Sequence, residues 1–179
     1  NAKAVLDRLP AVVAKFDPAG IGGAAPPMAG YFAMTAMPAR YALERGAWRE
    51  AAESAVPEEG TPFTIAIAHF ARAIGAAKTG HVPEAKADIQ RLAGLRDELE
   101  AGQDSYWAGQ VDIQRQVASA WVAFAEGQED EAIRLLRAAA DAEDASDKAA
   151  VTPGPLAPAR EMLGYMLLEA GQPEDALVE

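Results

Sequence analysis

A short turn built around glycine occurs four times in this chain of 179 residues, and it limits what the chain can fold into. In each copy an Ala-rich apolar segment ends at a glycine, and an alanine follows five residues later. A glycine just past a helix end can take the left-handed backbone conformation that closes the last helical turn. The four copies are Gly46/Ala51, Gly80/Ala85, Gly127/Ala132 and Gly171/Ala176. The sequence therefore predicts four helix–turn–helix units in one register.

A second small residue precedes each glycine by seven positions. These residues are Ala39, Ala73, Ala120 and Gly164. Two helices that cross closely need small side chains at the crossing, so the spacing predicts antiparallel pairs with small residues between them. The intervals between successive turn glycines are 34, 47 and 44 residues, so the units differ in length.

The composition favours helices throughout. Half of the residues are apolar, alanine is the most frequent of them, and aromatic residues make up only 7%. Such a chain is typical of packed helices and not of a β-sheet. The predicted helix pairs are 28–46 with 47–55, 61–80 with 82–102, 104–127 with 128–144, and 155–171 with 172–179.

Residues 1–27 form a separate leading part. Its first half is predicted to be a helix whose apolar residues lie on one stripe, and Pro10 is expected to kink or break that helix. The stripe consists of Val5, Leu6, Leu9, Val12, Val13 and Phe16. The Gly/Pro-rich stretch 17–27 is predicted to be a loop. It contains the spacing G-x-G-x-x-A at Gly20, Gly22 and Ala25, but a dinucleotide site needs a strand before it and a helix after it, which this context does not provide.

The spacing of the small residues resembles the tetratricopeptide repeat, whose period is 34 residues. The resemblance covers residues 28–179, and it implies an all-α right-handed solenoid of antiparallel helix pairs with irregular repeat lengths. The stretches 37–48, 106–121 and 151–177 are similar to the C-terminal parts of longer bacterial tetratricopeptide-repeat proteins of uncharacterised role. That similarity implies no activity, but it does imply that further repeat follows Glu179. The motif prefers a large apolar residue before the first small position, where this chain has Pro38, Arg72, Ser119 and Leu163.

In such a solenoid the first helix of each pair lines the concave surface. The resemblance therefore implies a peptide-binding groove lined by the first helices. The expected groove residues are Arg40, Phe70, Ile74, Lys78, Val117, Trp121, Phe124, Glu161 and Tyr165. For each aromatic residue core packing is the alternative, with Trp121 and Tyr165 favoured for ligand contact and Trp48 and Trp107 for a structural role. An apolar groove with acidic surroundings suits a partner helix or an apolar peptide that carries basic residues. Of the positions that match a carboxylate clamp, only Arg40 is cationic, so no such clamp is expected.

The charge excludes two classes of partner. The formal net charge is −11, and the sequence contains no basic cluster, so neither a nucleic acid nor an acidic membrane surface is an expected partner. No apolar run is long enough to span a membrane. The chain has no cysteine, which removes disulfides and thiol chemistry and fits a soluble cytoplasmic protein and a periplasmic one equally.

The candidate catalytic residues form no recognisable constellation. His69 and His81 are twelve residues apart and lack the spacing of a helical metal pair. The acidic stretch 141–147 lacks the glycine and the final glutamate of a calcium loop. The sequence therefore predicts no enzyme activity, no cofactor and no metal. The expected function is a non-catalytic scaffold that binds a protein or peptide. The alternative is a self-association or docking segment of a larger protein, with a homodimer formed through exposed repeat ends and any catalysis outside this segment.

Overall fold

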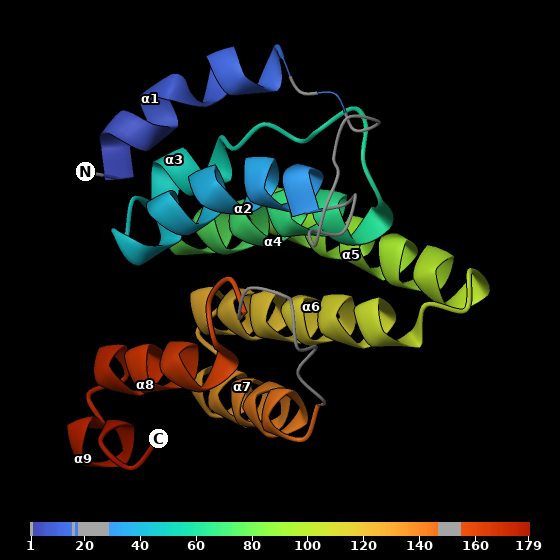
Figure 1. The fold of residues 1–179 in the computed structure, drawn as a ribbon. Coiled ribbons are helices and arrows are strands. Elements are labelled where there is room, and N and C mark those ends of the chain that lie inside the picture. Colours follow the sequence, from blue (N-terminus) through green and yellow to red (C-terminus); the bar gives the residue numbers. More distant parts are fainter. Residues whose placement is uncertain (1, 16, 18–28, 147–154) are drawn as a thin grey trace.

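The computed structural model describes residues 2–15, 17, 29–146 and 155–179 of the chain. All regular secondary structure in these residues is helical, which confirms the all-α prediction (Figure 1). The predicted loop at 18–27 and the fingerprint at Gly20, Gly22 and Ala25 lie outside the described residues. The helices are α1 (Ala2–Val13), α2 (Ala29–Glu44), α3 (Trp48–Ala52), α4 (Pro62–Lys78), α5 (Val82–Ala101), α6 (Ser105–Ala125), α7 (Glu129–Asp144), α8 (Ala159–Glu169) and α9 (Pro173–Ala176).

The four predicted glycine turns have one common geometry. The turn glycines have positive φ angles of 61°, 79°, 78° and 74° in chain order. In each turn the amide after the glycine donates to a carbonyl five residues earlier, as from His81 to Ala76 at 2.8 Å and from Gln128 to Ala123 at 2.9 Å. This bond closes a Schellman motif, which satisfies carbonyls that the helix end leaves unpaired. The turns join α2 to α3, α4 to α5, α6 to α7, and α8 to α9.

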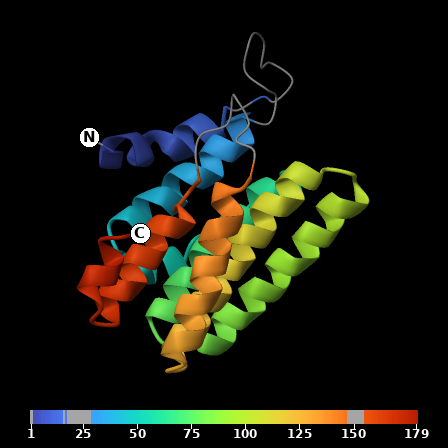
Figure 2. The same ribbon diagram turned by 90° about the horizontal axis from the view of Figure 1, so that it is seen from below.

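The first helices of the four pairs form a continuous row. Helix α2 contacts α4, α4 contacts α6, and α6 contacts α8. Each of the second helices α3, α5 and α7 packs between two consecutive first helices (Figures 1 and 2). Helix α1 packs against α2 and buries none of its residues.

The small residues lie at the closest packing positions, as their spacing predicts. Ala51, Ala73, Ala85, Ala120 and Ala132 are fully buried. A Cβ atom on Gly164 would lie 3.7 Å from the carbonyl oxygen of Ala176. Small side chains at these positions let the helix backbones approach one another.

Two sequence-based expectations about proline need correction. The break that was one alternative at Pro10 is absent, since α1 continues from Ala2 to Val13. The kink, the other alternative, stays a prediction. Because α1 buries no residue, water can hydrate the carbonyl that Pro10 leaves unpaired. The helix expected from residue 155 begins only at Ala159. A residue before proline avoids the helical region, and Pro158 itself has φ −55° and ψ 132°, so 155–158 is non-helical.

None of the helices in the described ranges is both long enough and apolar enough to span a membrane.

Candidate functional site

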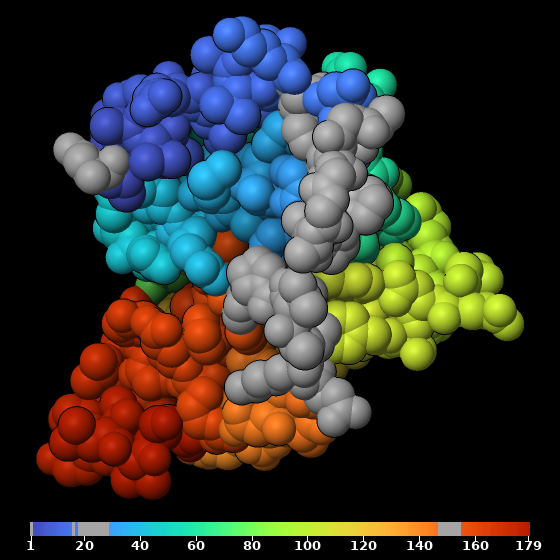
Figure 3. Space-filling model, in the orientation of Figure 1, coloured from blue at the N-terminus to red at the C-terminus, as the bar shows by residue number. Residues whose placement is uncertain are grey.

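A pocket of about 570 Å³ lies among the four first helices, and we call it the central pocket. Helices α2, α3 and α8 supply most of its wall, and Figure 3 shows the α2–α3 part above the α8 part on the same face of the molecule. The helices of its wall contribute Arg40, Leu43 and Glu44 from α2, Trp48 from α3, Lys78 from α4, Trp121 from α6, and Glu161, Met162, Tyr165 and Glu169 from α8. The rest of the wall consists of Gly46 and the non-helical residues 155–158.

Lys78, at the end of α4, links three other elements inside this pocket. Its ammonium nitrogen lies 4.3 Å from the ring centroid of Trp121 and 5.1 Å from that of Trp48. The same nitrogen forms an ion pair with Glu169 of α8, and the Lys78 side chain is only 10% exposed. Cation–π contacts strengthen when the cation is shielded from water, so Lys78 stabilises the packing of α3, α6 and α8 around α4.

Arg40 holds the non-helical wall. Its Nη2 atom donates a hydrogen bond of 2.8 Å to the main-chain carbonyl of Pro155. The next residue, Leu156, is 7% exposed and belongs to the hydrophobic core. The start of α8 is fixed from α7, because the amide of Ala159 donates to Oε2 of Glu143 at 2.9 Å. Residues 155–158 are therefore held in the pocket wall in two ways. Arg40 donates to their main chain, and the apolar side chain of Leu156 is buried in the core.

Trp121 forms the inner wall. It is 2% exposed, and its ring packs edge-on against Phe124 at a centroid distance of 5.7 Å. Its indole Nε1 is buried and has no hydrogen-bond partner among the described residues. Buried donors are nearly always paired, so an unpaired one in a pocket wall is a candidate contact for a bound molecule.

The mouth of the pocket is acidic. The hydroxyl of Tyr165, a residue that is 53% exposed, donates to Oε1 of Glu161 at 3.2 Å. This hydrogen bond, and more weakly the charges of Glu161 and Glu44, raise the pKa of Tyr165. Carboxylates from α2 and α8 thus act on the same hydroxyl.

The structure brings five of the nine expected groove residues together in the central pocket. They are Arg40, Lys78, Trp121, Glu161 and Tyr165. The other four lie elsewhere, since Phe70, Ile74 and Val117 are at most 1% exposed in the core and Phe124 packs partly buried against it.

The reason for this division is the position of α4 and α6 inside the helix stack. Helix α4 contacts α2, α3, α5 and α6, and α6 contacts α4, α5, α7 and α8, so neighbouring helices cover most of their surface. Phe70, Ile74 and Val117 therefore have almost no surface left for a ligand in this structure.

Two features of the pocket are missing from the sequence-based prediction. Trp48, expected to be structural, packs against the core and also lines the pocket, and Trp107 stacks on Phe63 at 4.0 Å between centroids. Residues 155–158 also enter the wall. The two prolines in that stretch are the signal that could have separated it from α8.

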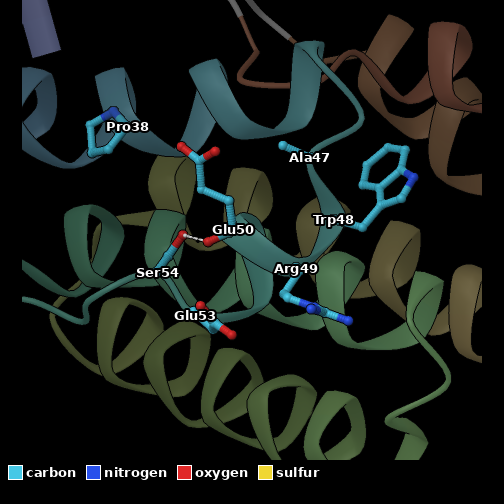
Figure 4. Close-up of a pocket in the computed structure, with 7 residues that line it drawn as sticks. All are labelled: Pro38, Ala47, Trp48, Arg49, Glu50, Glu53 and Ser54. Carbon is cyan, nitrogen blue, oxygen red and sulfur yellow. Dashed lines mark hydrogen bonds between the residues drawn. The ribbon is translucent and has the colours of Figure 1, made fainter. Parts of the chain in front are cut away.

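A second hollow, of about 670 Å³, also has Trp48 in its lining (Figure 4). Its lining residues are Pro38, Ala47, Trp48, Arg49, Glu50, Glu53 and Ser54. The hydroxyl of Ser54, which follows α3, donates to the carbonyl of Glu50 at 3.4 Å. Its lining includes no histidine that could act as a base for this serine.

The two histidines lie in different surroundings. His69 is buried on α4 beside Asp88 of α5, whereas the ring of His81 is exposed and lies 3.0 Å from the hydroxyl of Thr79. In the part of the chain that the structure describes, no three His, Asp or Glu side chains are grouped so that they could hold a metal ion.

Comparison of the chain with models of protein families, with curated proteins and with solved structures gives no match in any of the three.

Proposed function

We propose that the chain is a tetratricopeptide-type solenoid and a non-catalytic scaffold that binds a segment of a partner protein in the central pocket. The repeat assignment is supported by the four Schellman turns with glycine at the same position. It is also supported by the contacts, since first helices touch one another and the second helices α3, α5 and α7 each fill the space between two of them. In solenoids this arrangement creates an elongated surface on the side of the first helices.

One observation carries the binding function. A single pocket takes side chains from all four first helices, α2, α4, α6 and α8. Ligand sites in helical proteins are concave, mostly apolar and supplied with a few convergent polar groups. Leu43, Met162 and the two indoles supply the apolar part of this pocket, and Arg40 supplies a donor.

The contacts within the pocket support a peptide ligand. Arg40 donates to the main-chain carbonyl of Pro155, and Leu156 places its side chain in the core. A peptide from another protein would need the same two kinds of contact, a donor to its main chain and a cavity for an apolar side chain. The contacts that hold residues 155–158 in the pocket wall are thus of the same kind as those that we propose for a bound peptide.

The test is selection of peptides from a random heptapeptide phage library on the immobilised chain, followed by titration of selected peptides. Trp48 and Trp121 line the pocket, so their fluorescence reports occupancy. We expect Tyr165→Ala to weaken binding about tenfold, since Tyr165 is exposed at the mouth. The control is Leu177→Ala, an exposed residue outside the pocket. Failure to select peptides, or equal affinity for both variants, would overturn the proposal. Trp121→Ala is a poor test because that side chain is part of the core.

Self-association is the second candidate, and the exposed apolar residues near α9 favour it. Leu168 is 54% exposed, Leu177 88% and Val178 84%. Exposed apolar side chains of this kind can pair with a second copy of the chain. Sedimentation velocity of the wild type and of the double variant Leu177→Ser, Val178→Ser distinguishes the two candidates. A concentration-dependent dimer that the variant loses supports self-association, whereas a monomer in both cases excludes this interface.

A further inference from the structure

The cationic groups of the central pocket are already engaged. Arg40 donates to the carbonyl of Pro155 and lies 3.7 Å from a carboxylate oxygen of Glu44. Lys78 is paired with Glu169 and sits over two indole rings. Both cations thus already face a carboxylate of the pocket, and an incoming acidic group would compete with Glu44 or Glu169.

The pocket has more carboxylates than cations. It contains Glu44, Glu161 and Glu169 against the two cations Arg40 and Lys78. Glu161 accepts a hydrogen bond from the neutral hydroxyl of Tyr165, and within the described residues it pairs with no cation. Glu44 and Tyr165 are both exposed. The mouth thus offers carboxylates and an aromatic face, which together suit a guanidinium or an ammonium group.

The buried indole of Trp121 is a second and independent indication of a ligand. Its Nε1–H group has no acceptor among the residues that the structure describes, although Trp121 is 2% exposed and lines the pocket. An unpaired buried donor costs free energy, and that cost is removed when an acceptor arrives. A peptide brings main-chain carbonyls as well as side chains. One segment can therefore supply an acceptor for the indole of Trp121 and a cation for the carboxylate of Glu161.

We propose that the partner segment carries an arginine or lysine side chain that binds at the mouth of the central pocket, against Glu161, Glu44 and the ring of Tyr165. A main-chain carbonyl of the same segment accepts from the indole of Trp121. This inference rests on the proposed peptide-binding function and adds the chemistry of the ligand to it.

The experiment compares the peptides that the same random heptapeptide library yields on three forms of the chain. These are the wild type, the pocket variant Glu44→Gln/Glu161→Gln and the control variant Glu98→Gln/Glu100→Gln. Glu98 and Glu100 are exposed on α5 and do not line the central pocket, so both double variants change the net charge equally. The control therefore separates recognition in the pocket from general attraction to a chain with net charge −11.

We expect arginine and lysine to be enriched several-fold on the wild type and on the control, and this enrichment to vanish on the pocket variant. For one selected peptide, replacing its arginine by citrulline should weaken binding to the wild type about tenfold. The same replacement should have little effect on the pocket variant. On binding, the indole N–H resonance of Trp121 should shift more than that of Trp107, which stacks on Phe63. Unchanged circular dichroism of the variants confirms that they are folded.

Three outcomes would overturn the inference, and the first two leave the proposed function distinguishable from it. Selected peptides without basic enrichment would leave peptide binding in place and exclude a basic ligand. Equal loss of enrichment on the pocket and control variants would show general charge attraction only. If no peptide is selected on any form, both the proposed function and this inference fail.

Discussion

Nδ1 of His69 lies 2.7 Å from Oδ1 of Asp88, and Nε of Arg72 lies 3.1 Å from the other oxygen of the same carboxylate. The His69 and Asp88 side chains are 10% and 7% exposed, and they join α4 to α5. A carboxylate oxygen accepts hydrogen bonds, so Nδ1 carries the proton in this contact. The first histidine of the sequence is therefore a structural group inside the second helix pair.

Replacing Asp88 should destabilise the fold strongly. Asp88→Ala leaves the ring nitrogen of His69 and the guanidinium of Arg72 without their common acceptor, and removing one partner of a buried pair costs about 3 kcal/mol. Urea unfolding, followed by circular dichroism, measures the loss. The matched control is Glu98→Ala on the exposed face of the same helix, which should change stability by less than about 0.5 kcal/mol. Equal losses in the two variants would show that the contact adds nothing to stability.

Gly75 and Gly94 should respond in opposite directions to the same substitution. A Cβ atom on Gly75 would lie 2.5 Å from the carbonyl oxygen of Trp48 and 2.9 Å from the carbonyl carbon of Ala51, because α3 crosses α4 there. Gly75→Ala should therefore cost about 2 kcal/mol or more. A Cβ on Gly94 would meet nothing within 4 Å, and Gly94→Ala should stabilise α5 by about 0.5–1 kcal/mol. Thermal and urea unfolding of both variants test the pair, and a stabilising Gly75→Ala would contradict the close crossing.

The contrast between these glycines shows what the sequence could reveal. The four turn glycines were predictable because a helix terminus is a local structure, fixed by residues within a few positions. Gly75 lies inside a helix, and only the approach of α3, more than twenty residues earlier in the chain, explains it. The same limit applies to the pocket. The resemblance implied that Ile74 and Lys78 both line the groove, but only the packing decides that Ile74 is core and that Lys78 lines the pocket.

Gln103 should be replaceable by glycine with a gain in stability. It has a φ of 60° in the turn between α5 and α6, and the amide of Asp104 donates to the carbonyl of Leu99 at 2.9 Å. The positive φ and this hydrogen bond also occur in the four glycine turns, but here the residue with the positive φ is glutamine and not glycine. Gln103→Gly should stabilise the fold by about 1 kcal/mol, because the left-handed conformation no longer strains a Cβ atom.

The control for this substitution is Gln128→Gly. Gln128 is also exposed and also lies in a turn, but its φ is −94°. Glycine should bring no gain there, since it only increases the freedom of the unfolded chain. Urea unfolding of both variants gives the difference, and an equal response would mean that the backbone conformation of Gln103 is not strained.

Asp112 should make the fold sensitive to acid. Burial alone would raise the pKa of its carboxyl group, but hydrogen bonds from Arg115 at 2.8 Å, Gln116 at 2.7 Å and Arg96 at 3.2 Å lower it below the ordinary value of 3.8. A lowered pKa in the folded state means that the charged carboxylate stabilises the fold above the unfolded pKa. This contribution is lost as the pH falls from about 4 through the lower folded value.

The variant Asp112→Asn isolates this effect. At pH 7 it should be less stable than the wild type by about 1 kcal/mol, because it loses the charge-assisted bonds to Arg96 and Arg115. At pH 3 and below the difference should shrink, since the wild-type carboxylate is itself becoming protonated. Urea midpoints of both chains at pH 7, 5 and 3 measure the trend, with the exposed Glu98→Gln as the charge control. A difference that stays constant over this range would show that Asp112 contributes through packing and not through its charge.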